Sequence, residues 1–386
     1  MIFGRRFFET LVAGALCLIF ACHSVGVAQT PDGTLDSLRA SLAIRPDDDR
    51  LRAQLGQRLI EAKRYTEALY HFEILVDEVE DPGRRRLYQA VIARILAERP
   101  VGFGVILQVK PSTNLNTGSD QTRLTTSFGT LVIDEPSQAQ RGIEYSYGLN
   151  GFLRAPLDTG DRVRLSWSAY RTDYSTDLVE ARRTGQVALS WQRVRPRGSV
   201  AISIGEQTEF SDSERKNTSI ISLNGALPLA STRRLNWQLS QFNNRYRSDP
   251  EKSGLDHLLS LQHVWLSGDR RQETVGLLLE SSRPARAHQQ FRGLGISFGA
   301  RRSISDVVFV DASLNLGHRD FEGVFPGQSF ARKDTYGAIS LSVQRRRPIY
   351  RGFAPRMTCS VKRTESNITL YDATTTECAV SLARQF

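Results

Sequence analysis

Hydrophobic and polar residues alternate along most of the chain from Val101 onward. Segments such as 163–170, 293–299 and 308–316 place apolar side chains at every second position. Because successive side chains of a strand point to opposite faces, this period predicts β-strands. About fourteen such segments follow one another, each near the ten residues that a tilted strand needs to cross a bilayer. A water-soluble β-sandwich produces the same alternation, so the period alone does not decide between the two folds.

The connections between these segments favour a membrane barrel, because they alternate between short and long. Outer-membrane barrels have short turns on the periplasmic side and longer loops outside. An even number of strands would bring both ends of the barrel to the side of the short turns and leave no free edge. The predicted short turns are 156–161, 195–198, 230–234, 267–270, 303–306 and 346–352, and the predicted long loops include 111–140, 171–182, 247–254, 283–290, 319–334 and 364–375.

Aromatic residues at strand ends support the same interpretation. The four tryptophans fall on predicted strands, at or towards the ends assigned to the periplasm, which is typical of an interfacial girdle. The chain ends with Phe386, which shares one strand face with Cys378, Val380 and Leu382, as in the last strand of an outer-membrane barrel. We expect Phe386 to act in barrel closure and assembly. The girdle residues are Trp167, Trp191, Trp237 and Trp265.

Residues 33–100 have a helical pattern instead. The segment 51–75 resembles a tetratricopeptide repeat, with Leu-Gly, Leu, Tyr, Ala and Phe at the signature spacings. We expect Leu55, Tyr65, Ala68 and Phe72 to pack between helices. About two repeats are present, fewer than the three that a free-standing solenoid needs, so this head is expected to pack on the periplasmic mouth of the barrel.

The N-terminus has the pattern of a secretory signal peptide. Arg5 and Arg6 precede an apolar stretch at about 11–21, and small residues at 26–28 predict cleavage after Ala28. A twin-arginine signal and a lipoprotein cleavage box at Cys22 are weaker alternatives. The resulting organisation is a signal peptide at 1–28, a periplasmic tetratricopeptide-like helical domain at 29–100 and an outer-membrane β-barrel at 101–386.

Composition and candidate chemistry point away from catalysis and from nucleic acid. The net charge is +10, but the arginines are scattered over strand ends and turns and do not form an aromatic-interleaved stripe. The histidines of the mature chain stand singly, without partners at metal-ligand or triad spacing, and no glycine-rich phosphate loop is present. We therefore expect no catalytic residues, no metal site and no cofactor.

Two cysteines remain after signal cleavage, Cys359 and Cys378. They lie opposite each other in the last predicted hairpin, whose centre is near Ile368. In the oxidising periplasm a disulfide is the natural expectation. The alternative is a pair of free thiols facing lipid.

Three segments carry a family resemblance. They are the Asn-rich run Lys110-Pro-Ser-Thr-Asn-Leu-Asn-Thr-Gly118, the hairpin from Gly151 to Tyr174 and, most specifically, the terminal hairpin from Phe353 through Glu365-Ser-Asn-Ile-Thr-Leu-Tyr-Asp372 to Phe386. These segments resemble the barrel of the surface lipoprotein assembly modulators, the Slam family, and the resemblance covers about residues 101–386. The family joins a periplasmic tetratricopeptide domain to a fourteen-strand barrel, whereas the head of this chain is short.

The resemblance implies a translocator that helps a lipoprotein or other secreted protein client to reach the cell surface. The head would receive the client, and the barrel would provide the path. Asn114, Asn116, Arg171 and Asp173 are the implied client-binding or pore residues. Further partners would be the barrel-assembly machinery, outer-membrane lipids and a periplasmic chaperone. The rival interpretations are a polysaccharide exporter and a structural or adhesive barrel whose outer loops bind a ligand.

Overall fold

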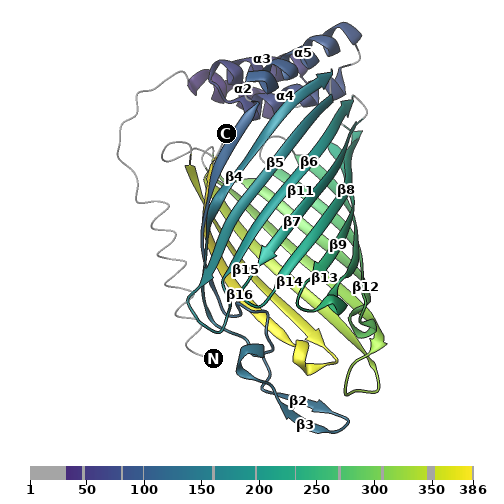
Figure 1. The fold of residues 1–386 in the computed structure, drawn as a ribbon. Coiled ribbons are helices and arrows are strands. Elements are labelled where there is room, and N and C mark those ends of the chain that lie inside the picture. Colours follow the sequence, from purple (N-terminus) through teal and green to yellow (C-terminus); the bar gives the residue numbers. More distant parts are fainter. Residues whose placement is uncertain are drawn as a thin grey trace.

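A closed β-barrel with a group of helices at one end makes up the described chain (Figure 1). The computed structural model describes residues 32–45, 48–79, 81–98, 100–158, 161–195, 198–230, 232–267, 271–305, 308–345 and 353–384. The predicted signal peptide and Phe386 lie outside these residues.

Four helices precede the barrel within the described residues, and here they are called the head. They are α2 (Asp32–Ile44), α3 (Asp49–Glu61), α4 (Tyr65–Glu78) and α5 (Pro82–Glu98). Asp48 caps α3, because its carboxylate accepts hydrogen bonds from the backbone amides of Arg50 and Leu51. None of these helices is long and apolar enough to cross a membrane.

A small apolar core holds the head together. Leu55 and Ala68 are fully buried, and Phe72 is nearly so, which confirms their predicted packing between helices. Tyr65 packs against this core from its edge. Gly56 lets α3 and α4 approach closely, since a Cβ atom there would lie 2.8 Å from the Phe72 ring.

Fourteen antiparallel strands form the barrel, in the order β1-β16-β15-β14-β13-β12-β11-β10-β9-β8-β7-β6-β5-β4. Each strand pairs with its sequence neighbour, and β1 closes the ring by pairing with β16 and β4. This confirms the predicted fold. The strands are β1 (Val101–Ser112), β4 (Gly142–Asp158), β5 (Asp161–Tyr174), β6 (Arg182–Arg195), β7 (Gly198–Phe210), β8 (Arg215–Ala230), β9 (Arg233–Tyr246), β10 (Gly254–Ser267), β11 (Arg271–Pro284), β12 (Phe291–Ser303), β13 (Val308–Val324), β14 (Ala331–Arg345), β15 (Phe353–Ser366) and β16 (Ala373–Arg384).

The two ends of the barrel differ. At the end that carries the head, called the helix end, successive strands end and begin close together in the sequence: β4 ends at Asp158 and β5 begins at Asp161. At the opposite end, called the loop end, the first connection is long and contains a separate hairpin, β2 (Arg123–Thr126) and β3 (Gly129–Val132). The other loop-end connections are shorter than predicted, because the strands continue into them: β13 reaches Val324, inside the predicted loop 319–334.

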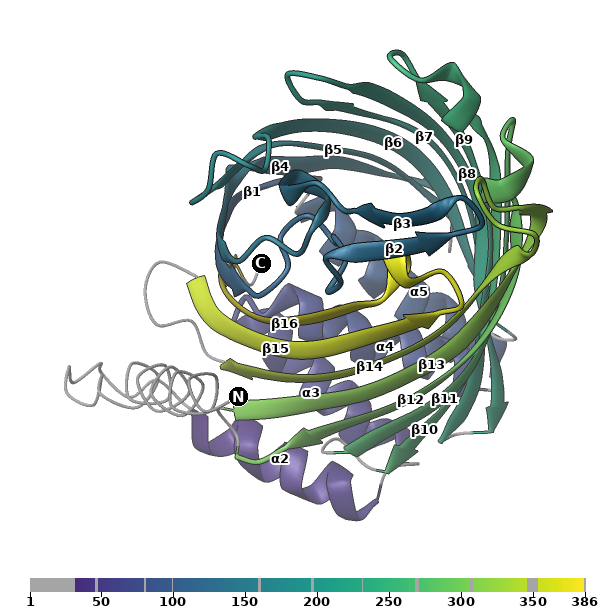
Figure 2. The ribbon, with the colours of Figure 1, turned by 90° about the horizontal axis from the view of Figure 1, so that it is seen from below.

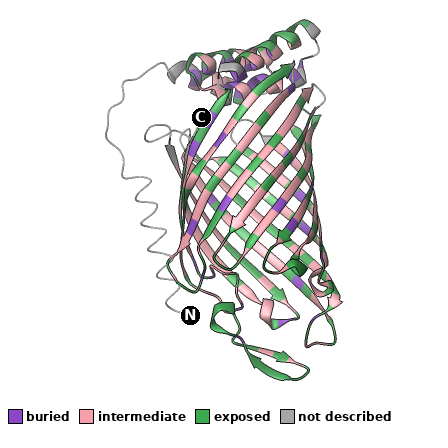
Figure 3. Ribbon diagram, viewed as in Figure 1, coloured by how far each residue is buried: buried purple, intermediate pink, exposed green. Residues whose placement is uncertain are grey.

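The outward face of the barrel is apolar. Exposed side chains alternate with less exposed ones along many of the strands, such as β7, as Figure 3 shows. Because the closed sheet has no second sheet to pack against, these apolar residues stay uncovered, which is the condition that a lipid environment satisfies. Exposed outward residues include Phe103, Leu149, Leu153, Val187, Leu189, Ile202, Ile204, Leu239, Leu277, Ile296, Leu341 and Val380.

Candidate transport path through the barrel

The inward face of the barrel carries mostly small polar side chains. They hydrogen-bond to one another across neighbouring strands: Ser222 to Ser240 at 3.0 Å, and Ser313 to Ser340 at 3.2 Å. Hydroxyl and amide groups give a hydrated wall without strong binding to any one segment of a passing chain. The wall therefore suits a transport path, and its two ends determine access.

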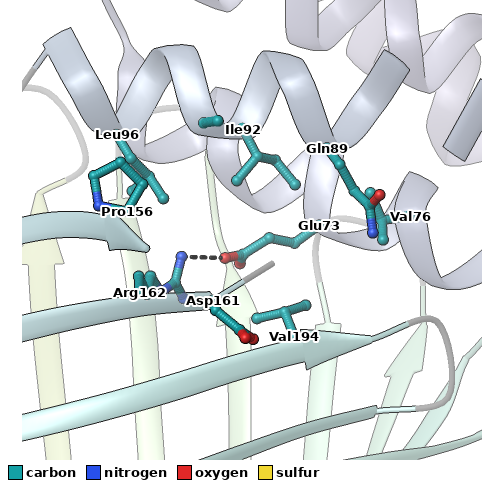
Figure 4. A pocket seen from close by; sticks show the side chains of 10 residues that line it. Glu73, Val76, Gln89, Ile92, Leu96, Pro156, Asp161, Arg162 and Val194 are labelled. Carbon is teal, nitrogen blue, oxygen red and sulfur yellow. Dashed lines mark hydrogen bonds and ion pairs between the residues drawn. The ribbon is translucent and has the colours of Figure 1, made fainter. Parts of the chain in front are cut away.

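The head lies across the helix end of the barrel (Figures 1 and 2). Helix α5 contacts β4, and α4 contacts β6. An apolar pocket separates the helices from the strand ends, and Glu73 of α4 forms an ion pair with Arg162 of β5 at its edge, with 3.0 Å between Oε1 and Nη1 (Figure 4). The head therefore packs on the barrel, as the shortness of its repeat array led us to expect. The pocket is lined by Glu73, Val76, Gln89, Ile92, Ala93, Leu96, Pro156, Asp161, Arg162 and Val194.

The β2–β3 hairpin crosses the loop end of the barrel, as Figure 2 shows. Its tip reaches the connection between β13 and β14, where Ser127 donates its backbone amide to the carbonyl of Gly327 at 2.9 Å. Gln328 donates from Nε2 to the carbonyl of Thr125 at 2.5 Å. Residues 113–141 therefore form an arm that is anchored on both sides of the opening.

Asn114 and Asn116 fold the base of this arm. Asn114 is buried, and its amide group exchanges two hydrogen bonds with the backbone of Gly118. Asn116 donates to the carbonyls of Pro136 and Gln138 at 2.7 and 2.8 Å, and its Oδ1 accepts from the backbone amides of Gly118 and Gln140. The side chains of both asparagines thus form hydrogen bonds within the arm itself, a role that the Asn-rich motif alone did not reveal.

Arg171 and Asp173 lie on the outward face of β5. They share the parity of Trp167, a residue that is 40% exposed, and Arg171 Nε donates to Asp173 Oδ1 at 2.8 Å. Tyr147 donates its hydroxyl to the same carboxylate. Alternation along the strand keeps both side chains out of the lumen. The structure therefore places Arg171 and Asp173 on a strand, because β5 continues through Tyr174 where a loop was expected to begin at residue 171. Their role as client-binding or pore residues stays a prediction.

A charged and aromatic cluster lies on the inner wall at the loop end, and sequence reasoning missed it. Arg319 of β13 forms a double hydrogen bond with Glu280 of β11 at 2.7 and 3.0 Å. The Arg319 guanidinium also lies 4.9 Å and 5.0 Å from the ring centres of Phe291 and Tyr336. Gly317 makes room for Tyr336, since a Cβ atom there would lie 2.3 Å from the ring. These residues come from four strands, so only the register of the barrel brings them together.

The tryptophans lie on the outward face, but not all at one level. Trp191 and Trp265 are near the helix end of their strands, whereas Trp167 is in the middle of β5. Trp167 and Trp237 lie over glycines of the neighbouring strands, Gly151 and Gly225. The structure thus places Trp191 and Trp265 near strand ends and Trp167 in the middle of its strand, and the interfacial girdle stays a prediction.

A disulfide joins Cys359 and Cys378 across the last hairpin, with Cα atoms 4.0 Å apart. The two residues are directly opposite in the register of β15 and β16. They share the outward face with Val361 and Val380. The bond therefore lies on the lipid side of the strand that closes the barrel.

Within the described ranges, no set of three or more His, Cys, Asp or Glu side chains is arranged to bind a metal. Carboxylates at the loop end accept hydrogen bonds that join neighbouring loops. Hydrogen bonds from the Ser213 and Ser211 side chains lower the pKa of Glu180, whose Oε2 lies 2.7 Å from the Ser213 hydroxyl.

Comparison with known proteins finds one family. The sequence model of a family described as surface lipoprotein assembly modifier matches residues 102–386. A search of curated proteins finds no match.

Several solved outer-membrane structures are similar in shape. The TodX monoaromatic hydrocarbon channel, in a deltaS2 mutant, is 8% identical, with 76% of this chain and 93% of that chain covered and a TM-score of 0.40. OprD of Pseudomonas aeruginosa is 7% identical, with 73% and 94% covered and a TM-score of 0.38. CdiB from Acinetobacter baumannii is 12% identical, with 74% and 60% covered and a TM-score of 0.40.

Proposed function

The chain belongs to the surface lipoprotein assembly modifier family, and we propose that it moves a lipoprotein or other secreted protein client across the outer membrane to the cell surface. The family match over the barrel carries this proposal. The uncovered apolar belt supports placement in the outer membrane, and the polar inner wall supports a path for an extended polypeptide. No step of the proposal requires bond-making chemistry by this chain.

The head is proposed to receive the client on the periplasmic side. It packs over the helix end, so a client or its chaperone that binds there is held at the entrance at high local concentration. The arm formed by 113–141 then lies at the exit. Because the arm is anchored on both sides of the opening, an emerging client must displace at least one of its anchors.

Deletion of the gene tests the proposal. Surface-exposed and secreted proteins are compared by mass spectrometry between the deletion strain and a complemented strain. Loss of one or a few lipoproteins or secreted proteins from the surface, with their total amounts unchanged, is the expected result. Loss of a surface polysaccharide alone would replace the proposal with the polysaccharide-exporter interpretation.

A variant that lacks residues 33–100 tests the role of the head. We expect this barrel to insert in the membrane normally and to fail in display of the client. Folding is followed by heat-dependent mobility on gels, which separates loss of display from loss of barrel. Display of every candidate client at the wild-type level by the headless variant would refute the receiving role.

A further inference from the structure

Three arginines gather on the inner face of the barrel at the helix end. Arg154 of β4 is directly opposite Arg164 of β5 in the strand register, and Arg162 lies two residues away on the same face of β5. Their neighbours of opposite parity, Leu153 and Leu165, are on the outward face, so alternation turns the arginines to the lumen. Like charges that are directly opposite on neighbouring strands destabilise the pair. The barrel therefore keeps an unfavourable concentration of positive charge at its entrance.

The ring of Phe152 partly offsets this repulsion. The guanidinium carbons of Arg154 and Arg164 lie 4.8 Å and 4.4 Å from its centre, within the range of cation–π attraction. Gly102 of β1 admits the ring, since a Cβ atom at this position would lie 2.4 Å from Phe152 Cε1. Among the described residues, neither Arg154 nor Arg164 is paired with a carboxylate. Arg154 and Arg164 are thus held in place without a salt-bridge partner among the described residues, although the charge of Glu73 also acts on Arg154.

The third arginine, Arg162, is already paired with a carboxylate, which belongs to the head. Glu73 Oε1 of α4 lies 3.0 Å from Arg162 Nη1, as the dashed line in Figure 4 shows. Arg162 is also fixed by a hydrogen bond from its Nε to Gln192 Oε1 at 2.7 Å. Only 16% of the Arg162 side chain and 30% of the Glu73 side chain are exposed. This ion pair shows that Arg162 accepts the carboxylate of a glutamate on a polypeptide.

We propose that Arg154, Arg162 and Arg164 form a binding site for an acidic segment of the transported polypeptide, and that Glu73 fills part of this site while no client is bound. The inference rests on the proposed transport of proteins. Guanidinium groups bind carboxylates through charge-assisted hydrogen bonds. Glu73 neutralises one arginine, whereas a segment with several carboxylates neutralises all three. An entering acidic segment thus displaces Glu73 and releases the head from β5.

Peptide binding to the full-length protein in lipid nanodiscs tests this site. The probe is a fluorescein-labelled decapeptide of glutamate, measured by anisotropy against glutamine and lysine decapeptides. Wild type is expected to bind the glutamate peptide with a salt-sensitive affinity. Glu73→Gln is expected to bind it about fivefold more tightly, because the competing carboxylate is gone. The pair Arg154→Gln and Arg164→Gln is expected to bind it about tenfold more weakly.

Matched variants separate the site from general charge. Arg215→Gln with Arg247→Gln removes the same charge at the loop end and should leave binding unchanged. Glu61→Gln removes a carboxylate whose ion pair, with Arg58, stays within the head, and should not raise the affinity. Heat-dependent gel mobility verifies that each barrel is folded.

Four results would overturn the proposal. Three concern the variants: wild-type binding by the Arg154 and Arg164 variant, an unchanged affinity in Glu73→Gln, and equal losses in the loop-end control. The fourth is tighter binding of an acidic polysaccharide such as polygalacturonate than of the peptide, which would reject a polypeptide as the ligand. The assay contains no client and measures no display, so its failure is distinct from failure of the proposed function.

Discussion

Lys110 Nζ lies 3.5 Å from Glu377 Oε2, and this ion pair joins the first strand of the barrel to the last. The same nitrogen lies 2.9 Å from Glu144 Oε2 of β4. One lysine therefore connects three neighbouring strands at the seam where β1 and β16 close the ring. The Lys110 side chain is 22% exposed, so water screens these pairs less than it would on an open surface.

Lys110→Met should weaken the closing seam. The change leaves Glu144 and Glu377 facing each other without a cation, at a cost of about 1–3 kcal/mol. We expect the temperature at which the folded form is lost on gels to fall. Lys362→Met, which removes an exposed lysine from the neighbouring strand β15, is the matched control. Equal unfolding temperatures for the two variants would show that the seam does not depend on Lys110.

The disulfide gives a second prediction at the same seam. Cys359 and Cys378 close a loop with a sequence separation of 19, and loss of such a link costs about 3 kcal/mol in the chain-entropy description. Alkylation of denatured, unreduced protein should label neither thiol, and labelling should require reductant. Replacement of both cysteines by serine should lower the unfolding temperature. Two labelled thiols without reductant would reject the bond in the native protein.

Acid should destabilise the head through His71. Burial, together with the charges of Arg52 and Arg39, lowers the pKa of His71 from 6.5 to about 3. The unfolded head therefore binds a proton that the folded head excludes. The stabilisation is complete above pH 6.5 and is lost as the pH falls from there towards 3, by about 1.4 kcal/mol per unit. Helical circular dichroism of the full-length protein measures this loss.

His71→Leu serves as the test variant for this acid response, and His288→Leu, in the connection between β11 and β12, is the control. The His71→Leu variant should keep its helical signal to a lower pH than wild type, whereas His288→Leu should follow wild type. Coincident acid transitions for wild type and His71→Leu would show that His71 is not the responsible group.

Asn116→Ala should loosen the arm without harm to the barrel. The side chain makes four hydrogen bonds to the backbone of the arm, each worth about 1 kcal/mol net. We expect faster proteolysis within 113–141 and reduced client display, with barrel abundance unchanged. Asn114→Ala should act in the same direction. Gln121→Ala, an exposed position in the same loop, should leave proteolysis at the wild-type rate.

The architecture was predictable because the two-residue period is dictated locally. Each strand of a closed barrel has one face towards lipid and one towards the lumen, so every strand repeats the alternation. The centre of the terminal hairpin could also be located from the sequence, which placed Cys359 opposite Cys378. Strand ends were less predictable. Polar residues such as Arg171 and Asp173 look like loop residues in sequence, although their shared parity with Trp167 would have placed them outward.

The contents of the lumen were beyond the sequence because they depend on register. Arg154 and Arg164 become neighbours only when β4 and β5 pair, and the Arg319–Glu280 pair joins β13 to β11 across β12. Asn116 contacts Gln138 through the fold of an irregular loop, for which no periodicity exists. Contacts between side chains on different strands do not produce a recognisable spacing of residues in the sequence.

A locked arm should block export while the barrel stays intact. The hairpin is held to the β13–β14 connection by contacts that include the hydrogen bond from Gln328 to the Thr125 carbonyl. The arm is anchored at its base and at its tip, on two sides of the opening, so we expect a client to break this contact at the tip in order to leave. Thr125→Cys with Gln328→Cys, linked by a short bismaleimide, should reduce client display to the level of the gene deletion.

The single-cysteine variants treated with the same reagent should display the client normally, since neither can form the link. The folded form on gels should be unaffected by the link, because both positions lie outside the barrel strands. Normal display by the linked double variant would mean that the client leaves without movement of the arm at this anchor. The exit would then lie between the arm and the wall formed by β5–β9.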